Sequence, residues 1–183
     1  MEIVFQASAQ SINILIVIDT EYVKKTHPKQ TNPNMQQPAG IDHVGQFMLC
    51  TGSRGIISGQ GSADLNFRAN PGDFVQFTGV SIYENSDDAV IVYNITKYGG
   101  TDVFNQFVPN VITRKNAVAP DPATENGLPA IHTQLNFNSF DSKVRNGGTE
   151  NFNVAFALYT LDDDGETQSL YGYFYWDPTI TVS

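Results

Sequence analysis

The stretch Ile12-Asn13-Ile14-Leu15-Ile16-Val17-Ile18 decides the fold class of this chain, because its apolar side chains are mostly β-branched and nearly continuous. Such a run predicts a β-strand that is buried on both sides or lies centrally in a sheet. Farther along, residues 63–68 alternate apolar with polar side chains, which predicts a half-buried strand with one face on the core.

Two pairs of strand-like segments flank short polar stretches and predict β-hairpins. The first pair is residues 74–83 and 89–95, separated by the turn-forming residues 84–88. The second pair is residues 152–161 and 169–176, separated by the acidic stretch 162–166. Many short strands with turn signals between them are typical of a two-sheet sandwich or a jelly roll.

Evidence for helices is thin. Residues 103–112 carry apolar side chains at helical spacing, but Pro109 interrupts them, so at most a short helix is expected there. Two polar stretches, residues 26–40 and 116–129, hold most of the prolines and predict extended surface loops. We therefore expect residues 1–183 to form a single all-β domain, a jelly-roll-like two-sheet β-sandwich with long surface loops.

The charge of the chain excludes some classes of partner. With a formal net charge of -9 and ten scattered Lys and Arg residues, the chain lacks the basic clusters that bind nucleic acid or anionic lipid. The apolar run at residues 12–18 is far shorter than the roughly 20 residues that span a bilayer, so membrane insertion is not expected. Proteins, neutral sugars and cations remain as partners.

The cellular compartment is expected to be the cytoplasm. Residues 1–5 begin with an acid after Met1 and do not resemble a signal peptide. The single Cys50 rules out an intramolecular disulfide and fits a reducing compartment. Export by a route without a cleaved signal stays an alternative.

Several motifs carry a resemblance that runs nearly end to end. They are residues 12–20 (INILIVIDT), 40–43 (GIDH), 54–61 (RGIISGQG), 85–90 (NSDDAV) and 170–178 (LYGYFYWDP). On these motifs the chain resembles the bacterial AidA/PixA family, also called inclusion body proteins. The resemblance implies a cytoplasmic bacterial protein, which in some members is deposited as intracellular crystalline inclusions, and it implies no enzymatic activity. Some members are methionine-rich, but this chain has only three Met, which argues against a sulfur-storage role.

The candidate nucleophiles and zinc ligands have simpler interpretations. Cys50 ends an apolar segment, where a thiol usually behaves as a small buried hydrophobe. Ser58 lacks the glycine pattern of a nucleophile elbow. Asp42 and His43 would point to opposite faces of a strand and would not converge on zinc. His43 is instead expected to donate to a carboxylate and stabilise a loop.

Two acidic turns are candidate calcium sites, because calcium is bound by carboxylate, amide and carbonyl oxygens from loops. The first turn contains Asp162, Asp164 and Glu166, which are the candidate calcium ligands. The second is oxygen-rich and contains the candidate ligand-binding residues Asn85, Asp87 and Asp88. An acidic hairpin turn exposed to solvent is the competing interpretation.

The aromatic segment near the C-terminus is a candidate binding surface. Alternation places Tyr171, Tyr173 and Tyr175 on one face of a strand, with Phe174 and Trp176 on the other. One face is expected to be core. The other is expected to form a subunit interface, where Tyr and Trp are enriched, or a platform for a neutral sugar. Tyr171, Tyr173 and Trp176 are the residues we select, and the interface is the favoured interpretation.

The leading hypothesis is a non-enzymatic inclusion body-type protein that acts by self-association or partner binding, with a homodimer as the expected state. The alternative is a lectin-like module that binds a neutral carbohydrate, with calcium held by the acidic turns.

Overall fold

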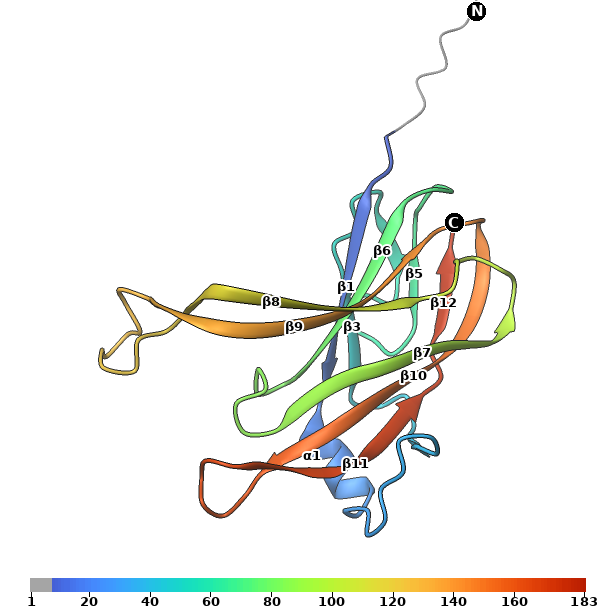
Figure 1. Ribbon diagram of the computed structural model, residues 1–183. Helices are drawn as coiled ribbons and strands as arrows, with labels where there is room; N and C mark the ends of the chain where they lie inside the picture. The colour runs from blue at the N-terminus through green and yellow to red at the C-terminus, as the bar shows by residue number, and fades with distance from the viewer. Residues whose placement is uncertain (1–7) are drawn as a thin grey trace, which may run out of the picture.

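The computed structural model describes residues 8–183, and the segment on which the targeting prediction rests lies outside this range. Its strands form two mixed sheets that pack together (Figure 1). The five-stranded sheet has the order β3 (Gln46–Cys50), β1 (Ser11–Ile18), β6 (Phe74–Ser81), β9 (Ile131–Lys143) and β8 (Val108–Ala119).

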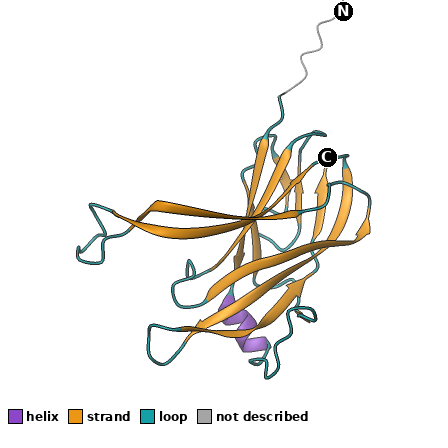
Figure 2. Ribbon diagram, in the orientation of Figure 1, coloured by secondary structure: helices purple, strands orange, loops and turns teal. Residues whose placement is uncertain are grey.

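The second sheet is built around β10 (Gly148–Leu161), the longest strand. Its order is β2 (Ala39–Gly40), β11 (Gln168–Trp176), β10, β12 (Thr179–Val182), β5 (Leu65–Phe67) and β4 (Ile56–Ser58). β7 (Ala89–Gly100) pairs antiparallel with β10 along the edge of β10 that does not pair with β11 and β12. Figure 2 shows that strands dominate the chain, as expected for an all-β two-sheet sandwich.

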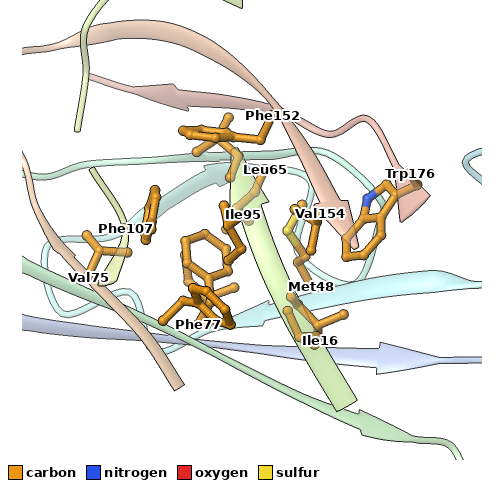
Figure 3. Packing of buried hydrophobic residues seen from close by; sticks show 14 of the residues in the cluster. Ile16, Met48, Leu65, Val75, Phe77, Ile95, Phe107, Phe152, Val154 and Trp176 are labelled. Carbon is orange, nitrogen blue, oxygen red and sulfur yellow. The ribbon is translucent and has the colours of Figure 1, made fainter. Parts of the chain in front are cut away.

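The core lies between the two sheets and is filled by aromatic and β-branched side chains (Figure 3). Ile16 from β1, Phe77 from β6 and Trp176 from β11 are almost completely buried. The sheets approach so closely at Gly79 that a Cβ there would collide with the Val92 side chain. A glycine is therefore required at this position of β6.

Several sequence predictions are confirmed. Residues 12–18 lie in β1, which occupies a central position between β3 and β6. Only one face of β1 is buried, however, and Leu15 on the other face is 36% exposed. β10 and β11 form the predicted antiparallel hairpin around the acidic turn. β5 shows the predicted burial on alternate residues.

The hairpin predicted for residues 74–95 is wrong, because β6 and β7 belong to different sheets. β6 pairs with β1 in parallel and with β9 antiparallel, whereas β7 pairs with β10. The two strands face one another across the core, so their apolar side chains pack together instead of lying side by side on one sheet. Pattern alone does not distinguish these arrangements, since both bury the same side chains.

The prediction for residues 103–129 also needs correction. The region expected to contain at most a short helix and a long loop forms β8, and the connection to β9 shrinks to residues 120–130. Pro109 is tolerated because β8 is the edge strand of its sheet, where a missing N–H leaves no partner unsatisfied. A helix, α1 (Thr20–Thr26), does occur, but in the stretch that follows β1. Asp19 caps it by accepting a hydrogen bond from the Tyr22 amide at 3.0 Å.

A buried ion pair holds the start of β1 to the start of β6. The carboxylate of Asp73, 1% exposed, accepts two hydrogen bonds from Arg54 at 2.5 and 2.9 Å. It also accepts the backbone amides of Gln10 and Asn70, each at 2.8 Å. The Arg54 guanidinium and these amides lower the pKa of Asp73 to about 2.

We expect Asp73→Asn to lower the free energy of unfolding at pH 7 by about 2 kcal/mol, because the amide cannot match the charge of Arg54. A carboxylate whose pKa falls on folding stabilises the protein above its unfolded value and loses this contribution as pH decreases. The difference from wild type should therefore narrow as pH falls towards about 2. Urea denaturation across this range measures it, with the exposed Asp163→Asn as the matched control. A difference independent of pH would contradict the assignment.

Candidate functional site

The β8/β9 hairpin extends away from the sandwich as an arm (Figure 1). β9 pairs with β6 only from Phe140 to Lys143, and its remaining residues pair only with β8. Phe140 itself pairs with Pro109 across the hairpin. We call the part beyond this pair, residues 110–139, the arm.

The arm carries apolar side chains that are not buried. Val111 is 72% exposed and Phe137 is 50% exposed. The other exposed large apolar side chains between the start of β8 and the end of the arm are Val108, Val118, Leu128, Ile131 and Leu135. Alternation along β9 places Ile131, Leu135 and Phe137 on one face of the hairpin, whereas Val111 and Val118 pair with Asn138 and His132 on the other face. Exposed apolar side chains gathered in this way typically mark an interaction site.

A groove of about 550 Å³ separates the root of the arm from β7. Its walls are residues 89–93 of β7 on one side and residues 109–111 and 136–140 of the hairpin on the other. The Asn138 side chain donates a hydrogen bond to the Val92 carbonyl at 2.7 Å and fixes the arm root against β7. The volume and the apolar lining of the groove are typical of pockets that bind a ligand or a segment of another molecule.

Two acidic loops, which we call the acidic rim, lie next to one another near this groove: residues 82–88, of which Asn85 lines the groove, and residues 162–166, which precede Gln168. Gln168, which lines the groove, joins them. Its side-chain amide donates to the carbonyl oxygens of Asn85, Ser86 and Asp87 at 3.0, 2.8 and 3.1 Å. Neither loop contains a lysine or arginine. Lys24 pairs with the buried Asp88 of the rim, and the carboxylates exposed on the rim are those of Glu84, Asp87, Asp163, Asp164 and Glu166.

The candidate ligand-binding residues of the first loop have different roles. The Asn85 carboxamide accepts hydrogen bonds from the amides of Ser81 and Val90, both at 2.9 Å, and closes the turn. Asp88 is buried and forms an ion pair with Lys24 at 2.7 Å. Asp87 is exposed on the rim. The three side chains therefore do not converge on one ligand position.

The candidate calcium ligands Asp162, Asp164 and Glu166 lie together in the β10/β11 turn. The carboxylate of Asp164 accepts the Thr167 hydroxyl at 2.6 Å and two backbone amides, which lowers its pKa to about 2. Asp162 accepts the Ser169 hydroxyl at 2.5 Å. Within residues 8–183, no group of three or more His, Cys, Asp or Glu side chains is arranged to hold a metal ion. Calcium binding here stays a prediction.

The aromatic strand β11 divides as its alternation indicates. Trp176 is fully buried, and its indole N–H donates to the Ala63 carbonyl at 3.3 Å, so the indole belongs to the core. The Tyr171 hydroxyl donates to the His27 carbonyl at 2.8 Å, and burial raises its pKa. Tyr173 is half-buried and packs edge-on against Tyr93. Of these rings, Tyr171 is the one that fastens the end of α1 to the sheet.

His43 connects three segments of the chain. Its ring lies 3.0 Å from Asp177 and 3.4 Å from Asp64, which also accepts the Thr179 amide at 2.6 Å. Partial burial lowers the pKa of the imidazole, but the hydrogen bond to Asp177 and the charge of Asp64 outweigh this and raise it overall. His43 thus stabilises a loop through carboxylates, as expected from the sequence.

Cys50 also lies where the sequence places it, in the core at 6% exposure. Burial raises the pKa of its thiol, which disfavours the reactive thiolate at neutral pH.

The arm is the feature that sequence reasoning missed. A signal for it exists, because Ile131, Thr133, Leu135 and Phe137 alternate with polar residues as a strand requires. The alternation predicts a strand, but only the structure shows that neither face of this strand meets the core.

Two packed mixed sheets, one of which continues into a projecting hairpin, define an all-β sandwich protein with an arm. The family model for PixA, described as an inclusion body protein, matches residues 10–182. The chain therefore belongs to the PixA family of inclusion body proteins, which confirms the resemblance seen in its motifs.

A solved structure supports the same assignment. The crystal structure of a PixA-family inclusion body protein from Burkholderia cenocepacia is similar to this chain, with a TM-score of 0.81 and 36% sequence identity. The similarity covers 99% of this chain and 100% of that one. A comparison with curated proteins finds no match. Among residues 8–183, no helix is long and apolar enough to cross a bilayer.

The His43 cluster predicts a pH-dependent stability. A histidine whose pKa rises on folding stabilises the protein below its unfolded pKa, and this contribution is lost as pH rises through the folded value. The melting temperature of His43→Gln should therefore fall below that of wild type by more at about pH 6 than at about pH 8. Thermal unfolding monitored by circular dichroism measures this, with the exposed His132→Gln as control. An equal deficit at both pH values would argue against the ion pairs.

Proposed function

We propose that the protein is a non-enzymatic inclusion body-type protein, produced in the cytoplasm, that acts by self-association through its arm. The observation that carries this proposal is the unburied apolar surface between Val108 and Phe137 on a hairpin that leaves the sandwich. Membership of the inclusion body family supports it, since inclusions require contacts between copies.

The physical argument concerns the stability of the arm itself. A two-stranded hairpin alone in water is at best marginally stable. Beyond Phe140, β8 and β9 pair only with each other, so their outer backbone groups and their exposed apolar side chains remain in water. Burial against another molecule removes this surface from water and orders the arm at the same time.

The dimensions of the arm suit an interface. The ten residues 110–119 of β8 span about 30 Å at the usual rise of a strand. A stable contact between proteins buries about 800 Å² on each partner. Two arms that each lie along a second molecule offer surface of this order, and the edge of β8 adds backbone groups that pair only on the β9 side.

Wild-type protein at micromolar concentration should sediment above the 20.1 kDa of one chain. Replacing both Val111 and Phe137 by Ser removes apolar surface from the arm without touching the core. We expect the dissociation constant to rise roughly 30- to 700-fold, from the loss of about 2–4 kcal/mol of burial.

The matched control is Val44→Ser with Ile57→Ser, which removes exposed apolar side chains outside the arm. These changes should leave the sedimentation coefficient unchanged. A wild-type protein that stays monomeric at high micromolar concentration would refute the proposal, as would arm variants that associate like wild type.

A further inference from the structure

We infer that the arm of a second copy of this chain occupies the groove beside β7, and that Arg114 and Lys115 of that arm face the acidic rim. This inference rests on the proposed self-association and adds its partner surface. The arm carries exposed basic and apolar side chains, whereas the acidic rim and the apolar groove lie beside β7.

The basic pair stands alone on the arm strands. Arg114 and Lys115 are the only lysine or arginine residues in the arm, and β8 has no acidic residue. Both side chains are exposed, and within residues 8–183 neither takes part in an ion pair. They lie at the register shift between Arg114 and Ala117, midway along the strand. Across the hairpin Arg114 pairs with Leu135, which is 39% exposed and lies on the same face as Phe137.

The groove and the rim present the complementary pattern. The groove wall includes Ile91, which is 45% exposed, and the rim beside it carries Asp87, Asp163 and Glu166 on its surface. The side chains of Asp163 and Glu166 accept no hydrogen bond within the described part of the chain, so their charges are free to meet a cation. An arm laid in the groove therefore places cations beside anions and apolar side chains against apolar side chains.

Charge selects a second copy as the occupant. The whole chain carries -9, so two bodies repel one another unless a basic segment of one meets an acidic segment of the other. The arm strands offer such a segment at Arg114 and Lys115, whereas the two acidic residues of the arm, Asp121 and Glu125, lie in the loop at its tip. Because each copy has both an arm and a rim, reciprocal exchange of two arms repeats the same contact twice and closes a twofold dimer.

A charge-swap experiment tests this contact. The arm variant carries Arg114→Glu with Lys115→Glu, and the rim variant carries Asp163→Lys with Glu166→Lys. Each alone places like charges together and should raise the dissociation constant about tenfold or more. In an equimolar mixture, the acidic arm of the arm variant meets the basic rim of the rim variant. The basic arm of the rim variant meets the acidic rim of the arm variant, so both contacts of the mixed dimer join opposite charges. Sedimentation of the mixture should show the dimer recovered.

The control is Lys25→Glu with Lys29→Glu, which changes net charge by the same amount at exposed positions outside the arm and groove. Association of this control should resemble wild type, and raising the salt concentration should weaken wild-type association because ions screen exposed charges. Wild-type self-association that is insensitive to both charge variants, or a mixture that fails to recover, would overturn this inference and leave the proposed function standing. A monomeric wild type would overturn both.

Discussion

Strand β9 has two neighbours over one part of its length and one neighbour over the rest, and the existence of the arm depends on this difference. Near its C-terminal end, β9 is held between β6 and β8 and contributes Phe140 to the core. Beyond Phe140, β9 pairs only with β8, and apart from the root at Asn138 and Ser139 the residues of β9 are exposed to solvent. The arm is thus a continuation of the five-stranded sheet, and its root is fixed by the Asn138 contact to Val92.

Charged side chains also differ between the sandwich and the arm. The acidic loops of the rim are built as turns, with Asp164 and Asn85 capping backbone amides, yet they leave Asp163 and Glu166 exposed. A net negative charge makes separate molecules repel one another, and in the proposed self-association the basic pair on the arm offsets this repulsion at one contact.

The sequence predicts the core better than the arm, for a physical reason. Burial of Ile16 and Trp176 follows from local alternation, and Cys50 and His43 lie in the environments their neighbours indicate. The assignment of β6 and β7 to separate sheets depends on long-range pairing that leaves no local pattern. The arm was missed because Pro109 suggested a break, whereas an edge strand accepts proline, and because exposed apolar residues contradict the expectation that strands bury one face.

Hydrogen exchange at several protein concentrations can show whether the protein self-associates through its arm, because it reports which amides become protected where one copy contacts another. If two copies associate through the arm, protection should rise with concentration at the amides of residues 110–119 and 131–139, and at those of residues 89–93 of β7. Protection in β10 and β11 should stay constant, because these strands are ordered within one molecule. Protection that rises elsewhere while the arm and β7 stay unchanged would contradict the account.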